Sequence, residues 1–430
     1  MAPNEVDAVT PTGRPSAEPT PVQPSRAAST RGLSRRWWAW PLLIYTVTRI
    51  VNAVMIVVAS RSAITMEEFV RIGGNHYGTS ADDAPLGYLT AVTRWDGQWY
   101  WEIAAHGYPA HLPVDAAGAV QENPWAFFPL YPYIVRAVMF VSRQDFPIAA
   151  SIVSLTFGAL AMMVLYRLVA RRHGHLGGVL AVLGLSTFVC APVFQIAYTE
   201  SLALFLVLLT ISLVIDRRHG WALLTLALLG LTRGVAVAFA PALALYVVML
   251  WRRGELSRPR LLRLGGLAAA AAATGVAWPV IAGVVTGQPR AYFLTQQAWN
   301  PELSSIPILR FVERNSDVPG GTAGAFVFAI LWAAVLLWFL GLGQREPLMR
   351  AWVYAYVLYV LAVVDWNWSA VRYYLLALPV FWPLVAAAPE RDNPRQRVVV
   401  AIVFALVGLA LQWWWIRYCV IISPQLVQVP

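Results

Sequence analysis

The chain has 430 residues, of which 59% are hydrophobic and only 13% are charged. A single soluble core cannot bury that much apolar surface, so the composition predicts a polytopic membrane protein and excludes a soluble enzyme. The net charge of +10 comes from arginines in short segments between apolar runs. This pattern is typical of membrane orientation signals and not of a nucleic-acid-binding surface.

The amino-terminal residues 1–36 are predicted to be a disordered cytoplasmic tail, because most of them are Pro, Ser, Thr, Ala and Arg without hydrophobic periodicity. The integral membrane domain then covers residues 37–430, and its first span lies at 38–59 with the preceding arginines inside. A cleavable signal peptide is the alternative interpretation. The apolar run of about 22 residues is longer than the ~7–15 residues of a signal-peptide core, which favours a retained span.

Residues 60–146 are predicted to form a long, acidic first extracytoplasmic loop, with a short, proline-containing interfacial helix at 125–141. Residues 221–250 must leave and return between two basic clusters, which predicts two short helices that meet at 232–234. A second large extracytoplasmic loop is expected at 287–322. The other spans are predicted at 147–169, 177–194, 199–215, 261–286, 323–343, 349–364, 371–388 and 397–418. The eleven crossings place the amino terminus inside and the carboxy terminus outside.

The most informative segment is residues 94–109, RWDGQWYWEIAAHGYP, in the first external loop. Asp96 stands there among tryptophan and tyrosine residues, and an ionisable group near lipid is costly unless it has a role. An aspartate can accept the proton of a reacting hydroxyl as a general base, and neighbouring aromatic rings suit the faces of sugars. The alternative is that Asp96 only caps a helix that follows it.

Further polar and aromatic residues fall at the predicted outer face. The residues predicted to contact substrate are Arg94, Trp95, Tyr100, His106, Glu200, Gln296 and Trp299. Arg233 and Arg372 are predicted to bind a phosphate, because a guanidinium holds a phosphate with two parallel hydrogen bonds. Each residue also has a structural alternative: a helix cap for Glu200, an ion pair with an acidic neighbour for Arg94, snorkelling for the two arginines, and loop packing for His106, Gln296 and Trp299.

Five ordered blocks resemble the PIG-V family of mannosyltransferases. They are residues 94–109, 127–132 together with Arg136, 198–202, 230–234 and 370–374. The resemblance implies a GT-C membrane glycosyltransferase fold of about 11 transmembrane helices, a polyprenyl-phosphate-mannose donor, inversion at the anomeric carbon and Asp96 as the active-site aspartate. It also suggests Arg136 as a third donor-phosphate ligand. The chain departs from the family pattern at Gly234-Val235, which leaves the role of that helix break open.

The sequence therefore predicts an inverting α-mannosyltransferase. It would move mannose to a hydroxyl of a glycolipid, lipoglycan or glycoprotein at the outer face of a bacterial cytoplasmic membrane. No cofactor, metal or nucleic acid is expected, since the lipid-phosphate sugar is itself a substrate. Two alternatives stay open: a lipid-linked sugar flippase or transporter, and a GT-C enzyme that uses a polyprenyl-phosphate pentose.

Overall fold

The computed structural model describes residues 36–71, 87–299, 346–363, 370–377 and 394–421, with isolated positions between 321 and 334. Within these residues the structure is helical, and its β structure is limited to an isolated bridge between Val114 and Val120. The α-helices are α1 (Ala39–Ser60), α2 (Met66–Arg71), α3 (Tyr88–Ala91), α4 (Asp96–His106), α5 (Leu130–Ser142), α6 (Phe146–Ser186), α7 (Glu200–Ile215), α8 (His219–Gly230), α9 (Phe239–Arg252), α10 (Arg258–Thr286), α11 (Ala291–Ala298), α14 (Pro347–Val363), α15 (Ala370–Tyr373) and α17 (Pro394–Trp415). The tighter or wider turns are η1 (Pro124–Ala126), η2 (Ala191–Gln195), η3 (Gly234–Ala238), η4 (Tyr374–Ala377) and the π-helical η5 (Ile416–Val420).

The predicted all-α polytopic architecture is confirmed. Five helical segments of the described chain are long and apolar enough to cross a membrane. They are Ala39–Ser60, Phe146–Ser186, Gly234–Arg252, Arg258–Thr286 and Val398–Val420. The count of eleven crossings stays a prediction, because the predicted spans at 323–343 and 371–388 lie largely outside the described residues, as does the predicted tail at 1–36.

The predicted pair of spans at 147–169 and 177–194 corresponds to two helical segments within α6. The segments join at Gly174, whose φ of 71° and ψ of −178° are not helical and are adopted by glycine without steric strain. The chain reverses there, since Tyr166 Oη lies 2.6 Å from His175 Nδ1 and Ser186 Oγ lies 3.7 Å from Met162 Sδ. The second predicted span is too long, since the helix ends at Ser186. The 3₁₀ turn η2 follows, where Pro192 lacks the N–H that a continuing α-helix requires.

The predicted break within residues 221–250 is present. Helix α8 ends at Gly230, Arg233 has an extended backbone (φ −160°, ψ 154°), and α9 begins at Phe239 after the turn η3. Arg233 therefore leaves the helical path at the point where the two short helices meet. An interruption of this kind exposes backbone groups that need partners, and it is tolerated where the chain lines a protein interior.

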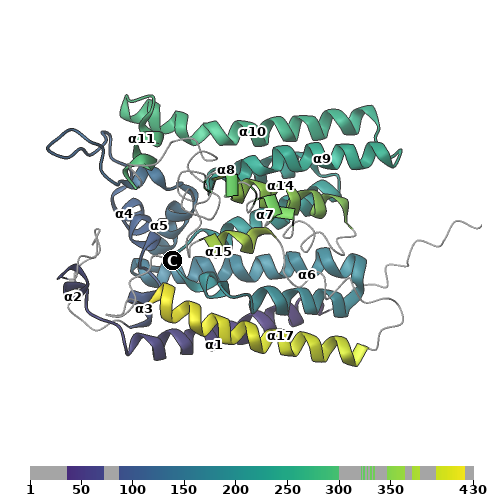
Figure 1. The fold of residues 1–430 in the computed structure, drawn as a ribbon, viewed down its shortest axis with the longest axis horizontal. Coiled ribbons are helices and arrows are strands. Elements are labelled where there is room, and N and C mark those ends of the chain that lie inside the picture. Colours follow the sequence, from purple (N-terminus) through teal and green to yellow (C-terminus); the bar gives the residue numbers. More distant parts are fainter. Residues whose placement is uncertain are drawn as a thin grey trace, which may run out of the picture. The chain divides into compact units, whose positions relative to one another are not determined.

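Ion pairs near the end of α7 show which segments lie on the same side of the membrane domain. Asp216, directly after α7, pairs with Arg171 at 2.8 Å, and Arg172 pairs with Glu346 at 2.8 Å. Glu200 opens the same helix, whose 16 residues span about 24 Å at 1.5 Å per residue. Figure 1 shows α4, α5 and α11 gathered at one end of the long helices α6 and α10.

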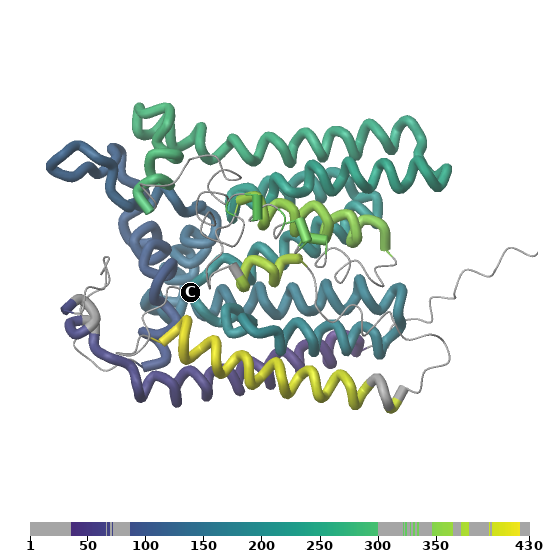
Figure 2. Tube along the Cα trace, viewed as in Figure 1, coloured from purple at the N-terminus to yellow at the C-terminus, as the bar shows by residue number. Residues whose placement is uncertain are grey.

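Helices α1 and α17 lie side by side although they are far apart in the sequence (Figure 2). Asn52 Nδ2 donates to Gln412 Oε1 at 2.7 Å, and Gln412 Nε2 donates to the Ser186 carbonyl at 3.1 Å. Arg49, in the middle of α1, donates to the carbonyls of Ser186, at 2.8 Å, and Ala191. These polar groups satisfy the Ser186 carbonyl at the end of α6 and the Ala191 carbonyl at the start of η2.

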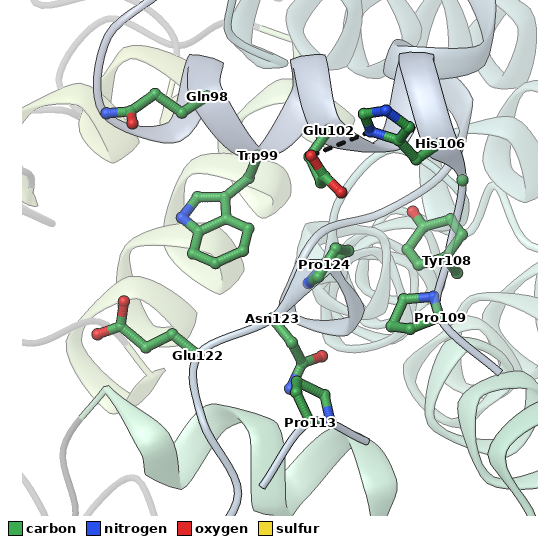
Figure 3. Close-up of a pocket in the computed structure, with 11 residues that line it drawn as sticks. Gln98, Trp99, Glu102, His106, Tyr108, Pro109, Pro113, Glu122, Asn123 and Pro124 are labelled. Atoms are coloured by element: carbon green, nitrogen blue, oxygen red, sulfur yellow. Dashed lines mark ion pairs between the residues drawn. The ribbon is translucent and has the colours of Figure 1, made fainter. Parts of the chain in front are cut away.

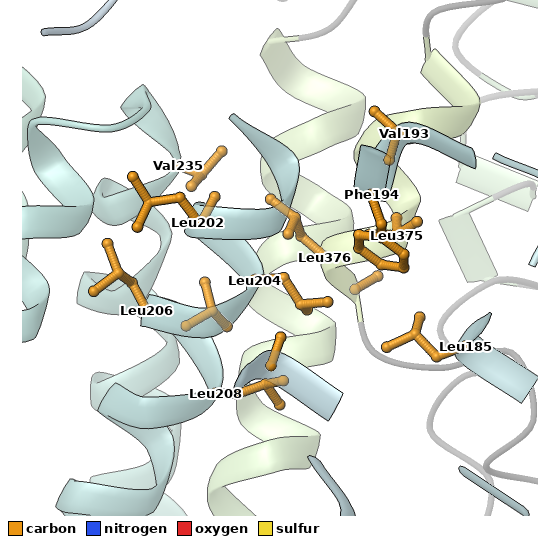
Figure 4. Packing of buried hydrophobic residues seen from close by; sticks show 14 of the residues in the cluster. Leu185, Val193, Phe194, Leu202, Leu204, Leu206, Leu208, Val235, Leu375 and Leu376 are labelled. Atoms are coloured by element: carbon orange, nitrogen blue, oxygen red, sulfur yellow. The ribbon is translucent and has the colours of Figure 1, made fainter. Parts of the chain in front are cut away.

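The apolar core surrounds α7. Leu202, Leu204, Leu206 and Leu208 are all buried, and they pack among residues of η2, η3 and η4 (Figure 4). Because α7 is buried on nearly every side, its polar first residue, Glu200, is held in the interior as well. The core thus fixes the position of a carboxylate that would otherwise face water or lipid.

Candidate functional site

Asp96 begins α4 directly after a strained residue. Trp95 has φ 57° and ψ −123°, a conformation that residues with a side chain rarely adopt. Strained backbone of this kind is found preferentially at functional sites, where the surrounding structure holds it in place. The Asp96 side chain is 28% exposed and pairs with Arg372. The alternative in which Asp96 only caps α4 does not describe this geometry.

Four charged side chains form one network, here called the Asp96 cluster: Asp96, Glu200, Arg233 and Arg372. Arg372 Nη2 lies 2.6 Å from Asp96 Oδ2, and Arg372 Nη1 lies 3.4 Å from Glu200 Oε1. Arg233 Nη1 lies 2.6 Å from the same Glu200 oxygen. The sequence nominated all four residues separately. The structure brings them together from α4, α7, the break before η3, and α15.

The cluster is buried except at Asp96. Glu200 is 0% exposed, Arg372 is 5% exposed, and the Arg233 side chain is 11% exposed, so neither arginine has the interfacial, snorkelling position that was the structural alternative. Arg233 Nη1 also donates to Thr199 Oγ1 at 3.1 Å. Two carboxylates and two guanidiniums cancel in charge, and mutual pairing offsets the large cost of removing them from water.

Aromatic rings cover the two arginines. The Tyr373 ring centroid lies 4.5 Å from the Arg233 guanidinium carbon and 5.4 Å from that of Arg372, and the Tyr198 ring lies 4.7 Å from Arg372. Cation–π contacts of this type stabilise a desolvated guanidinium. Tyr198, Tyr373 and Thr199 were not nominated from the sequence, although Thr199 and Tyr373 each adjoin a nominated residue and Tyr198 lies two residues before Glu200.

Tyr100 lies one helical turn after Asp96 and is also buried. Its ring makes edge contacts with Phe127 and Tyr131 at centroid distances of 5.4 and 5.2 Å. Burial raises the pKa of Tyr100 above its ordinary value, and the negative charge of Asp96 raises it further. The phenol is therefore neutral at physiological pH and can donate a hydrogen bond.

Arg94 is buried without an ion pair. It is 4% exposed, and none of its guanidinium nitrogens has a hydrogen-bond partner within the described part of the chain. The acidic neighbour expected from the sequence is therefore not found there. Burial lowers the pKa of Arg94 to about 10, so the side chain remains charged at neutral pH.

The other nominated residues lie outside the cluster. His106 pairs with Glu102 at 3.2 Å and has a 61% exposed side chain. Gln296 Nε2 donates to the Ala126 carbonyl at 3.4 Å, and the Trp299 ring lies 5.6 Å from that of Trp99. Arg136 is an exposed residue of α5 that forms no ion pair with the cluster among the described residues.

A cavity of about 450 Å³, here called the α4 pocket, lies between α4 and the segment that follows it. Trp99 projects from the helix toward its centre, Glu102 and His106 follow along the same helix, and Glu122 and Asn123 face them (Figure 3). Four of these five residues were not nominated from the sequence. The four-residue spacing of Gln98, Glu102 and His106 could have indicated a polar stripe on a helix. Glu122 stands in a loop without periodicity and gives no comparable signal.

No protein-family model and no curated protein sequence matches the chain. Among solved structures, it is similar to an oligosaccharyltransferase from Archaeoglobus fulgidus in complex with Zn and sulfate, with 13% identity and a TM-score of 0.48, over 89% of this chain and 53% of that one. The archaeal oligosaccharyltransferase AglB from the same organism, in complex with an inhibitory peptide and a dolichol-phosphate, gives 13% identity and a TM-score of 0.46, over 90% and 56% of the two chains. The chain thus spans about half the length of these structures. TM-scores below 0.5 carry no conclusion about activity.

Proposed function

We propose that the protein is an inverting GT-C-type glycosyltransferase that moves mannose from a polyprenyl-phosphate-mannose donor to an acceptor hydroxyl, with Asp96 as the general base. The single observation that carries the proposal is the Asp96–Arg372 ion pair at the exposed edge of an otherwise buried cluster. It joins the two chemical groups that such a transfer requires, a carboxylate that can accept a proton and a guanidinium that can hold a phosphate. The ordered motif blocks that resemble the PIG-V family supply the sugar and the lipid class.

The proposed reaction is a single displacement. The acceptor oxygen attacks the anomeric carbon while its proton passes to Asp96, and the bond between that carbon and the phosphate oxygen breaks. The polyprenyl phosphate then leaves with the bond's electron pair. Arg372 and Arg233 stabilise the negative charge that develops on the phosphate, a form of electrostatic stabilisation by groups that are already in place. Since the arginines take this role, the proposed reaction uses no metal ion, and we expect activity to persist in EDTA.

The contact between Arg372 and Asp96 suggests that the donor binds before the acceptor. In the structure Arg372 holds Asp96 Oδ2, the oxygen nearest to the guanidinium. A donor phosphate is a second anion that competes for the same guanidinium. Donor binding is therefore proposed to loosen the pair and leave the carboxylate open to the acceptor hydroxyl. Glu200 keeps its contact with Arg372 Nη1, so a small rotation of the side chain is sufficient.

The proposed location is a bacterial cytoplasmic membrane with the site on the outer face and the amino terminus inside. One structural observation and the positive-inside rule support this orientation. The basic segments at Arg171 and Arg172 pair with residues at the far end of α7 from Glu200, and arginine-rich ends are typical of the inner face. A glycolipid, lipoglycan or glycoprotein would present its hydroxyl at the outer surface.

The test is donor-dependent transfer by Asp96→Asn protein. Membranes that contain the variant at normal abundance are supplied with radiolabelled polyprenyl-phosphate-mannose, and we expect transfer to fall about 10²- to 10⁴-fold, as for loss of a general base. Asp115→Asn is the matched control. Asp115 lies exposed in the same loop, where its Oδ1 accepts hydrogen bonds from the Ala117 and Ala119 amides, and an asparagine oxygen can accept them equally well.

Retained activity in Asp96→Asn protein would exclude Asp96 as the base. The acceptor is identified separately by mass spectrometry of envelope glycolipids and glycoproteins from cells with and without the gene. A glycolipid or glycoprotein that lacks a mannose in the cells without the gene would be the acceptor. If the missing sugar is a pentose, the donor is a polyprenyl-phosphate pentose and not polyprenyl-phosphate-mannose.

A further inference from the structure

The α4 pocket and the Asp96 cluster occupy different faces of one short helix. At about 100° per residue, Asp96, Tyr100 and Ile103 lie on one stripe of α4, which is the side of the cluster. Gln98, Glu102 and His106 lie on a second stripe, roughly a quarter turn or more away. The second stripe lines the pocket. Trp99 stands between the two, about 60° from Asp96.

The two faces differ in charge. The Asp96 side contains both buried arginines. Among the described residues, those that line the α4 pocket include two glutamates, Glu102 and Glu122, one histidine that lies 3.2 Å from Glu102, and no arginine. Phosphate and carboxylate groups are repelled by such a wall, whereas hydroxyl groups donate hydrogen bonds to carboxylates. The pocket therefore suits a neutral, hydroxyl-rich ligand.

The aromatic wall of the pocket is rigid. The Trp99 ring stacks on Phe127 at a centroid distance of 5.8 Å with 19° between the planes, and Trp299 packs against its edge at 5.6 Å. Asn123, at the opposite wall, is fixed by hydrogen bonds with Thr295 Oγ1 at 3.0 Å and the Trp125 amide at 3.0 Å. A site whose walls are already ordered loses little entropy when a ligand binds. The cavity volume of about 450 Å³ lies within the range of roughly 300–1,000 Å³ that small-molecule sites have.

We propose that the α4 pocket binds the acceptor, and that the acceptor residue is an uncharged sugar. Trp99 would lie against the apolar face of the ring, while Glu102 and Glu122 would accept hydrogen bonds from its hydroxyl groups. One hydroxyl would then reach past Trp99 toward Asp96. This inference rests on the proposed glycosyl transfer. It goes further by naming specificity residues and by excluding an anionic acceptor sugar.

Binding is measured separately from catalysis, by saturation-transfer NMR on the full-length protein in lipid nanodiscs. The probes are methyl α-D-mannopyranoside, methyl β-D-glucopyranoside and methyl β-D-glucuronide. The last two differ at C6, where the glucuronide carries a carboxylate. We expect at least one neutral glycoside to bind, to both wild-type and Asp96→Asn protein, and the glucuronide to bind at least tenfold more weakly.

The variants are Trp99→Ala, Trp99→Phe and Glu122→Gln, with Glu67→Gln as the control. Glu67 is an exposed acid of α2 and does not line the pocket. We expect Trp99→Ala and Glu122→Gln to weaken binding of the neutral glycoside at least tenfold, and Glu67→Gln to leave it unchanged. Trp99→Phe keeps an aromatic ring that can stack on Phe127 and should retain most binding. Loss of binding in Trp99→Ala but not in Trp99→Phe would show that the aromatic ring is required.

In transfer assays Trp99→Ala and Glu122→Gln should raise the KM for the neutral acceptor and leave the KM for the donor within twofold of wild type. The proposal is overturned if no neutral glycoside binds, if the glucuronide binds equally well, or if the pocket variants behave like Glu67→Gln. The proposed transfer reaction fails on a different result, retained donor-dependent transfer by Asp96→Asn protein.

Discussion

Asp96 and Arg372 meet at 2.6 Å although one opens α4 and the other lies in α15, near the far end of the described chain. Arg372 is buried, whereas Asp96 keeps part of its carboxylate exposed. The pair therefore marks the boundary between the protein interior and the space that a substrate can enter. It connects the charges of the interior to the one carboxylate of the cluster that a ligand can reach.

Replacement of Arg372 by lysine should weaken donor binding. The guanidinium contacts Asp96 and Glu200 with different nitrogens, and a lysine ammonium is a single point charge that cannot reproduce this fork. In the proposed reaction we expect the KM for polyprenyl-phosphate-mannose to rise tenfold or more in Arg372→Lys protein, measured from initial rates. Arg172→Lys is the control, since Arg172 is half exposed and its ion pair in the described part of the chain is with Glu346. Equal donor KM values in the two variants would contradict a phosphate role for Arg372.

Neutralisation of Glu200 should destabilise the protein. Glu200 is fully buried between Arg233 and Arg372. In Glu200→Gln protein Arg372 keeps Asp96 as a partner, but Arg233 loses the carboxylate that it pairs with, and the cluster is left with one excess positive charge. We expect a loss of about 3–5 kcal/mol in the free energy of unfolding, as for other buried pairs that lose one partner. The measurement is thermal unfolding of the purified protein in nanodiscs.

Two further variants test this explanation. Glu200→Gln combined with Arg233→Met also removes the guanidinium that lost its partner and should recover part of the lost stability. Asp216→Asn breaks the half-exposed pair with Arg171 and should change stability by less than about 1 kcal/mol. A loss in Asp216→Asn as large as that in Glu200→Gln would show that burial is not the cause.

Arg94→Met should stabilise the protein. A pKa lowered from 12.5 to about 10 by burial means that the fold disfavours the charged form, by roughly 3 kcal/mol at 1.36 kcal/mol per pKa unit. The sign follows from the protonation state: at pH 7 the side chain is charged in the folded and unfolded states, so the whole penalty falls on the folded one. An apolar side chain of similar length removes it. A lower unfolding temperature for Arg94→Met would indicate that the guanidinium has a stabilising partner.

Close helix packing at Gly408 should make an alanine costly. A Cβ at Gly408 in α17 would overlap the carbonyl oxygen of Thr187, which is backbone and cannot rotate away. We expect Gly408→Ala to destabilise by about 1–3 kcal/mol. Gly265 in α10 is the matched control, since a Cβ there meets open space and alanine should stabilise the helix by roughly 0.5–1 kcal/mol. Thermal unfolding of both variants decides between these signs.

The charged residues of the site could be predicted because charge in an apolar chain is rare. Asp96, Glu200, Arg233 and Arg372 each stand next to apolar or aromatic runs, which was enough to nominate them one by one. Their pairing could not be predicted, because it depends on how four separate segments pack. For the same reason the sequence assigned Arg94 an ionic partner that is not found among the described residues.

Helix ends were predicted well where charge or glycine marks them and poorly elsewhere. The start of α7 at Glu200 and the break at Arg233 agree with the prediction. Gly174 was expected to lie in a loop between two spans, and two helical segments do meet there, but the non-helical backbone is confined to Gly174 itself and is not a loop of several residues. Hydrophobicity alone cannot distinguish a kink from a short loop, because both leave the apolar runs on either side unchanged.

The electrical neutrality of the Asp96 cluster has a consequence for product release. In the proposed reaction the donor is a phosphodiester with one negative charge, and the departing polyprenyl phosphate carries two. The proton that leaves the acceptor arrives on Asp96, so the total charge of cluster and lipid is the same before and after transfer. Arg372 then no longer pairs with an ionised Asp96, while its contact with Glu200 remains, and it binds the doubly charged product more tightly than the donor. Return of that proton to water would therefore be coupled to release of the lipid, and a solvent isotope effect on turnover is its expected signature.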